Sequence, residues 1–263
     1  MNESNLNQPP SPPPLPAMPS RQREDRPLGE DPNDCVPLVG PVAVVEAVLR
    51  HPRRVVFHLR QSSPGRLIAT LLAAALGFIA VYGAIVGSFS GGMQWWATPL
   101  KITAGLAVTA AICLPSLYIF TCLCGSSARL PEVAGALGGM LALMTLLLIG
   151  FAPVAWLFSQ STESVAMMGF FHVIFWLVSV GFGIRFLNAA FQHFGLRSDT
   201  GLKAWMIIYL LVSLQMTSAL RPLLGPGDNQ PLLPVEKKFF AAHWLDNLDG
   251  EHRTSERGPT RNQ

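Results

Sequence analysis

Residues 67–89 read LIATLLAAALGFIAVYGAIVGSF and contain no charged side chain. About 20 consecutive apolar residues form a helix long enough to cross the hydrocarbon core of a bilayer. Just before this segment lies a cluster of arginines, here called the arginine collar: Arg50, Arg53, Arg54, Arg60 and Arg66. Basic residues beside a first span keep that side of the membrane in the cytoplasm. The junction therefore predicts a membrane-spanning helix with a cytoplasmic N-terminus.

The composition agrees with lipid as the solvent for most of the chain. Half of the residues are hydrophobic and 13% are charged, against about 25% in ordinary soluble domains. The net charge of +3 is too small to indicate binding to nucleic acid. Because the positive charge gathers in the collar, we expect its arginines to contact anionic lipid headgroups, at about 1 kcal/mol for each Lys or Arg near the surface.

Charged residues divide the apolar middle of the chain into five predicted spans. Their bounds are Leu67–Phe89, Ile102–Cys124, Val133–Phe158, Val165–Phe186 and Ala204–Leu220. We expect the fourth helix to continue past Arg185, because apolar residues recur at helical spacing as far as Gly195. Five spans place the two termini on opposite sides of the membrane.

The predicted fold is all-α and integral to the membrane: a five-helix transmembrane bundle with interfacial amphipathic helices before the first span and after the fifth. Its parts are a disordered, Pro-rich cytosolic tail over 1–36, basic interfacial helices over 37–66, the five-span domain over 67–225, and a tail over 226–263 with a short amphipathic helix at 235–248. We expect the interfacial segment to break at Pro52. The bacterial cytoplasmic (inner) membrane is the expected location.

Few polar side chains fall at membrane depth. His172 lies in the middle of the fourth span, and Tyr209 and Gln215 lie in the fifth. An ionisable group in a span is a functional hypothesis by default, but a single histidine without a carboxylate forms neither a proton relay nor a metal site. Two interpretations stay open: His172 is a hydrogen-bonded packing residue, or these side chains line a cavity near Pro115 and Pro153, which interrupt the backbone hydrogen bonds of two spans.

Small residues at four-residue spacing predict close helix packing. The pairs are Gly83/Gly87, Gly135/Gly139 and Ser179/Gly183, and such pairs let helix backbones approach closely in lipid. Packing within one chain and a contact between two copies both remain open. The cysteines follow neither a zinc nor a disulfide spacing; they are Cys35, Cys113, Cys122 and Cys124.

The sequence lacks nucleotide-binding loops, nucleophile elbows, metalloprotease motifs and paired intramembrane carboxylates. We therefore expect no enzymatic activity, no cofactor and no metal. The favoured function is a non-enzymatic multi-pass scaffold or accessory protein that organises the membrane or partner proteins. Its partners would be membrane lipids and other membrane proteins or copies of itself. The alternative is a small transporter or permease subunit with a cavity near Pro115, Pro153, His172 and Gln215.

Three phrases resemble the Yip1-type family of five-span membrane proteins. They are Tyr82-Gly83, LPSLYIFTCLCG at 114–125 and LQMTSALRPLLG at 214–225, within a resemblance over about residues 45–225. The last phrase resembles the end of the last span in uncharacterised bacterial relatives. The cytosolic motifs by which eukaryotic members approach small GTPases are absent, which argues against a vesicle-trafficking role. The resemblance implies an integral scaffold that shapes or organises membrane, and it assigns no catalytic residue.

Overall fold

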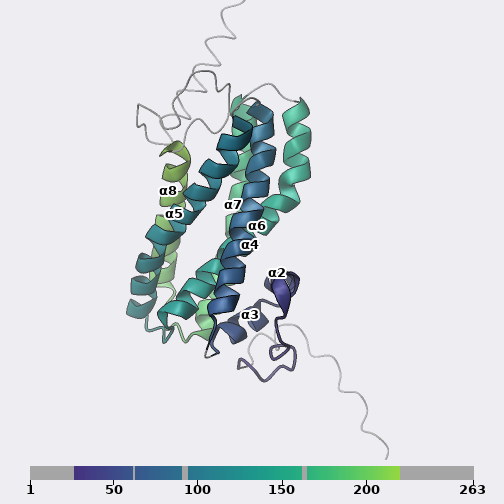
Figure 1. The fold of residues 1–263 in the computed structure, drawn as a ribbon. Coiled ribbons are helices and arrows are strands. Elements are labelled where there is room, and N and C mark those ends of the chain that lie inside the picture. Colours follow the sequence, from purple (N-terminus) through teal and green to yellow (C-terminus); the bar gives the residue numbers. More distant parts are fainter. Residues whose placement is uncertain (1–26, 62, 91–93, 162–164, 220–263) are drawn as a thin grey trace, which may run out of the picture.

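The apolar segments form long helices. The computed structural model describes residues 27–61, 63–90, 94–161 and 165–219, and no strand occurs in these ranges. The long helices are α4 (Gly65–Ser90), α5 (Gln94–Leu123), α6 (Leu130–Ser161), α7 (Val165–His193) and α8 (Thr200–Ala219). They run along one another in a single bundle (Figure 1). For the part of the chain described, the all-α prediction is confirmed.

Four of these helices are long and apolar enough to cross a membrane. Their apolar stretches are Gly65–Ser88, Trp96–Leu123, Leu130–Phe158 and Gly169–His193, and α8 has a shorter one at Thr200–Met216. This repetition of span-length apolar helices indicates a multi-pass integral membrane protein.

Two helix ends test the rule that spans stop at charges. α5 begins at Gln94, ahead of the predicted Ile102, and includes both Pro99 and Lys101. A lysine near a helix end can extend its side chain to the membrane surface, so it need not end a span.

α7 continues to His193 as predicted. There Gly195 has φ +78°, and the N–H of Leu196 donates to the carbonyl of Phe191, which closes the last turn.

The two short helices at one end of the bundle differ in depth. They are α2 (Gly40–Arg50) and α3 (Pro52–Leu59), separated at Pro52 as predicted. α3 contacts α4, α6 and α7, and its apolar side chains Val55, Val56 and Leu59 are fully buried. The segment predicted to lie on the membrane surface therefore includes a helix that fills the end of the bundle.

α2 lies across the bundle axis and is seen nearly end-on in Figure 1. Its inner face buries Val44, Ala47 and Val48 against α4 and α6. Its outer face is also apolar: Val42 is 79% exposed and Leu49 49% exposed. One apolar face of α2 packs on the bundle. The other apolar face is available for contact with lipid.

The structured region begins earlier than the sequence predicts. Residues 27–36, assigned above to a disordered tail, form turns that pack against α3, and Asp34 is buried among them. Residues 1–26, the tail 226–263 and its predicted helix at 235–248 lie outside the described residues.

α6 is the central helix and contacts α2, α3, α4, α5 and α7. Its glycines mark the closest approaches: a Cβ on Gly135 would overlap Leu59 of α3, and one on Gly139 would come within 2.6 Å of Phe186 of α7. Gly183 of α7 meets Met140 in the same way. These members of the small-residue pairs pack against other helices of the same chain. This agrees with the interpretation of packing within one chain.

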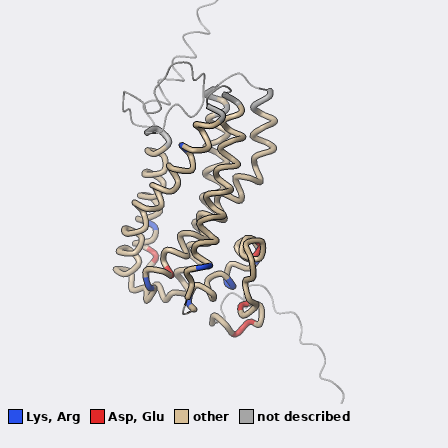
Figure 2. The backbone as a smooth tube through the Cα atoms, viewed as in Figure 1, with Lys and Arg blue, Asp and Glu red and all other residues tan. Residues whose placement is uncertain are grey.

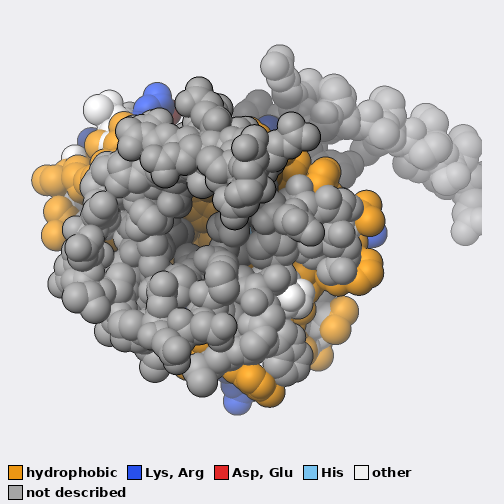
Figure 3. All heavy atoms as spheres, turned by 90° about the horizontal axis from the view of Figure 1, so that it is seen from above, with side chains coloured by type: hydrophobic (Ala, Val, Ile, Leu, Met, Phe, Trp, Pro, Cys, Tyr) orange, Lys and Arg blue, Asp and Glu red, His pale blue; other side chains and the backbone are white. Residues whose placement is uncertain are grey.

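The surface has the polarity of a membrane protein. Large apolar side chains are exposed around the rim of the bundle (Figure 3), including Val81, Ile112 and Phe182. Figure 2 shows the charged residues of the described part gathered mainly at the end where α3 lies. We refer to this as the charged end.

The glycine contacts give a matched pair of substitutions on α6. Gly139→Ala should lower the free energy of unfolding by about 1–3 kcal/mol, because Phe186 has to shift. Gly150→Ala adds the same methyl where nothing lies within 4 Å, and should be neutral or stabilising by up to about 1 kcal/mol. Thermal unfolding in detergent measures both; equal effects would contradict the proposed helix contact.

Candidate functional site

The histidine at membrane depth is part of a pair. The Tyr82 hydroxyl of α4 lies 2.7 Å from Nδ1 of His172 on α7, and the two rings meet edge to face. This is the contact that the first interpretation, a hydrogen-bonded packing histidine, requires. Its Nε2 is buried and has no hydrogen-bond partner among the residues that the structure describes. Tyr82 is not among the residues predicted for a site, because no sequence pattern links two residues that are 90 positions apart.

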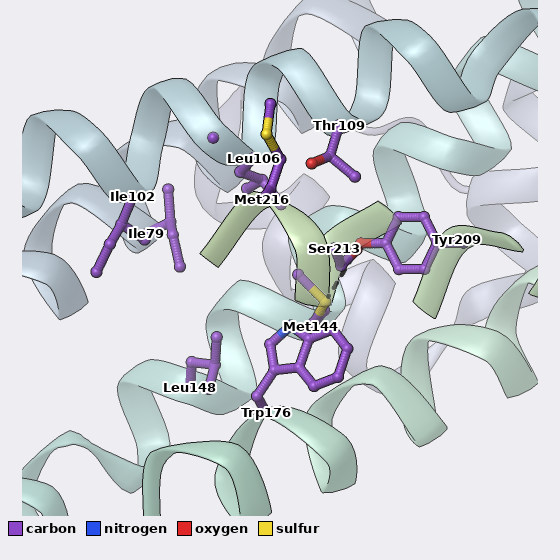
Figure 4. Close-up of a pocket in the computed structure, with 11 residues that line it drawn as sticks. Ile79, Ile102, Leu106, Thr109, Met144, Leu148, Trp176, Tyr209, Ser213 and Met216 are labelled. Carbon is purple, nitrogen blue, oxygen red and sulfur yellow. Dashed lines mark hydrogen bonds between the residues drawn. The ribbon is translucent and has the colours of Figure 1, made fainter. Parts of the chain in front are cut away.

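A cavity of about 110 Å³ lies one helical turn from this pair. It is bounded by all five long helices and is shown in Figure 4. The lining residues are Ile79, Ile102, Gly105, Leu106, Thr109, Met144, Leu148, Trp176, Tyr209, Ser213 and Met216. No charged side chain belongs to this lining.

Tyr209 is the one predicted cavity residue that lines it. The ring is fully buried, stacks on Trp205 with centroids 5.4 Å apart, and its hydroxyl donates to the sulfur of Met144 at 3.8 Å (Figure 4). Trp205 in turn donates its indole N–H to the carbonyl of Cys113 on α5 at 3.0 Å. α8 is thereby attached to α5 and α6 through two aromatic side chains.

The other members of the predicted cavity do not line it. His172 bonds to Tyr82 instead, and Gln215 is exposed on α8. Pro115 and Pro153 are exposed and lie within helices that continue through them. Helix rotation turns these side chains away from the space around Tyr209, so they do not line this cavity. The transporter alternative with a cavity near Pro115, Pro153, His172 and Gln215 stays a prediction.

The arginines of the collar differ in exposure: Arg53 and Arg54 are half-buried, whereas Arg50, Arg60 and Arg66 are exposed. The Arg53 guanidinium lies 3.4 Å from the Asp34 carboxylate, and the two side chains are 15% and 5% exposed. Arg54 donates to the carbonyls of Val36 and Pro37 at 2.7 and 2.6 Å. Both arginines hold residues 27–37 against α3.

Arg60 connects α3 to the end of α7. It donates to the carbonyl of His193 at 3.0 Å and lies 6.0 Å from the centre of the Phe194 ring. That carbonyl is in the last turn of α7, where backbone acceptors lack helical partners and a cation is favourable. Arg60 is itself exposed, as are Arg50 and Arg66, and Arg50 forms an exposed pair with Glu46 at 3.8 Å.

Metal-ligating side chains do not gather anywhere in the described ranges: no group of three His, Cys, Asp or Glu residues is close enough to hold an ion. All the cysteines are free thiols, with Cys113 buried and Cys122 exposed.

Fold and site together define a multi-pass membrane protein, helical throughout its described spans, with a paired histidine and an apolar central cavity. No family model, curated protein or solved structure matches the chain.

The Tyr82–His172 pair predicts coupled mutational effects. Tyr82→Phe and His172→Phe should each lower the free energy of unfolding by about 1–3 kcal/mol, because each leaves a buried polar atom without its partner. The double variant should cost less than the sum, since it removes both polar groups. Thermal unfolding of the four proteins measures the coupling, and strictly additive losses would contradict the hydrogen bond.

Proposed function

We propose that the protein is a non-enzymatic multi-pass scaffold or accessory protein that organises the bilayer or partner membrane proteins. The observation that carries this proposal is the use of polar groups at membrane depth. Tyr82 and His172 bond to each other, Tyr209 bonds to Met144, and Trp205 bonds to the backbone of α5. Each of these bonds joins two helices.

Acid–base or nucleophilic chemistry needs a nucleophile, a base and a stabilising group around one reactive position. Around the cavity, the polar side chains are three hydroxyls and one indole, with no carboxylate, imidazole or amine. This supports a protein without enzymatic activity. The proposal also agrees with the resemblance to Yip1-type scaffolds.

We further propose five spans, with α8 as the fifth. α8 has 20 residues, which at 1.5 Å per residue gives about 30 Å, the thickness of a bilayer core. In Figure 1 it runs beside α5 along the bundle. The collar favours the cytoplasm for the N-terminus, in a bacterial inner membrane.

The five-span arrangement predicts the sides of the two termini. In a cysteine-free background, Ser20→Cys should react with an impermeant thiol reagent from the cytoplasmic side, and Ser255→Cys from the opposite side. Labelling of inside-out and right-side-out vesicles measures both positions. Reaction of both cysteines from one side would contradict α8 as a span.

The lipid contact of this scaffold is assigned to α2 and to Arg50 and Arg66. α2 presents Val42 and Leu49 outward, at the same end of the bundle as Arg50 and Arg66. Apolar side chains can enter the headgroup region while guanidinium groups meet lipid phosphates. Arg53, Arg54 and Arg60 are occupied by contacts within the chain.

This division predicts that two double variants with the same change in charge behave differently. Arg50→Gln/Arg66→Gln should weaken the preference for phosphatidylglycerol over phosphatidylcholine by about 1 kcal/mol per arginine, more at low salt, with little change in thermal stability. Arg53→Gln/Arg60→Gln should chiefly lower thermal stability, because it leaves Asp34 and the end of α7 without their partners. Spin-labelled lipids in bilayers of the full-length protein report the preference.

An equal loss of lipid preference in both double variants would contradict the assignment to Arg50 and Arg66. The scaffold itself would be contradicted by solute uptake into liposomes that contain only the purified protein. Uptake abolished by Tyr209→Phe would favour the transporter, since Tyr209 lines the cavity.

A further inference from the structure

The central cavity lies at the middle of every long helix. Ile79, Thr109, Met144, Trp176 and Tyr209 each fall within three residues of the midpoint of α4, α5, α6, α7 and α8 respectively. If these helices cross a bilayer, the cavity is at its midplane. The surrounding medium at that depth is hydrocarbon, made of the ends of the lipid acyl chains.

The chemistry of the lining suits hydrocarbon better than water or a polar solute. Apolar side chains predominate, and the Tyr209 hydroxyl is already bonded to Met144. A buried water needs two to four polar partners, whereas the remaining polar atoms come from Thr109, Ser213 and Trp176 on three different helices (Figure 4). Met144 and Met216 have flexible side chains that adapt to an irregular apolar guest.

The size of the cavity restricts the shape of the guest. At about 110 Å³ it is smaller than the roughly 150 Å³ that accepts a benzene ring. It holds a few methylene groups, so a larger molecule has to extend outside. Ile102, Leu106, Trp176 and Met216 line the cavity and are also partly exposed, which gives such a molecule a way out to the bundle surface.

We propose that this cavity binds the terminal segment of one acyl chain from a bilayer lipid, with the rest of the lipid outside the bundle. A chain end matches the depth, the narrow volume and the apolar lining. Filling the space restores the dispersion contacts that an empty cavity lacks. The site is independent of the scaffold function proposed above, because a scaffold that has an empty cavity would still organise partners through its surface.

The proposal is tested with a phospholipid that carries a diazirine at the end of one acyl chain, mixed into nanodiscs with the full-length protein. Light expels N₂, and the resulting carbene inserts into a neighbouring C–H or O–H bond, which joins the lipid covalently to that residue. Mass spectrometry then locates the attachment. Label is expected on Met144 and Tyr209, which are 1% and 0% exposed, and also on the exposed Leu177 that faces bulk lipid.

A cavity-filling variant and a matched control sharpen the result. Ser213→Leu places a larger side chain in the cavity, and should reduce labelling of Met144 at least tenfold while Leu177 is labelled as before. Gly150→Leu adds bulk on α6 where nothing lies within 4 Å, and should leave both positions unchanged. Thermal unfolding shows whether each variant folds.

If Ser213→Leu does not fold, Met216→Phe is used as the cavity-filling variant instead, because Met216 lines the cavity and is partly exposed. The experiment on the wild-type protein alone can refute the proposal. Label on Leu177 without label on Met144 or Tyr209 would overturn it. Unchanged labelling of Met144 in a folded cavity-filling variant would also overturn it.

Discussion

Hydrocarbon offers no hydrogen bonds, so the backbone groups of this chain have to be satisfied within the chain wherever water is absent. Inside a helix the requirement is met automatically, but at a helix end it is not. At the charged end, the loops after α5 and α7 satisfy each other's carbonyls: the backbone N–H of Ser127 donates to the carbonyl of Phe194, and the backbone N–H of Arg197 donates to the carbonyl of Cys124. Arg60 of α3 takes the neighbouring carbonyl of His193. The packing of α3 under the bundle thus follows from the needs of the helix ends as well as from its apolar face.

The same requirement explains the polar side chains at membrane depth. A phenol, an imidazole or an indole in lipid is unfavourable unless it has a partner, and the partners here lie on neighbouring helices. Tyr82 joins α4 to α7, Tyr209 joins α8 to α6, and Trp205 joins α8 to α5. These bonds act together with the close glycine contacts of α6 and α7, which involve Gly139 and Gly183.

The sequence predicts the helices well and their mutual arrangement poorly, for a physical reason. Length and lack of charge identify the segments that become α4 to α7, and Gly195 marks the end of the fourth span because a positive φ suits glycine. The rotation of each helix about its axis leaves no such signal, because nearly all of its faces are apolar. Position within a span therefore predicts Gln215 as a cavity residue, whereas its side chain is exposed on α8 in the structure.

The collar shows the same limit. Five arginines before a span predict orientation, but the sequence does not distinguish Arg53, which pairs with Asp34, from Arg50, which is exposed. The aspartate lies in a Pro-rich, polar stretch that otherwise has the composition of a disordered segment. Local sequence patterns do not predict a long-range ion pair between such a stretch and a helix.

The bond between Trp205 and Cys113 joins residues 92 positions apart. At a synthesis rate of about 5–20 residues per second, α5 leaves the ribosome several seconds or more before α8 exists. During that interval the face of α5 that later receives Trp205 is open to lipid or to an insertion factor. The bundle is consequently completed late in translation. In a chain truncated before α8, the face of α5 that contacts Trp205 would stay uncovered.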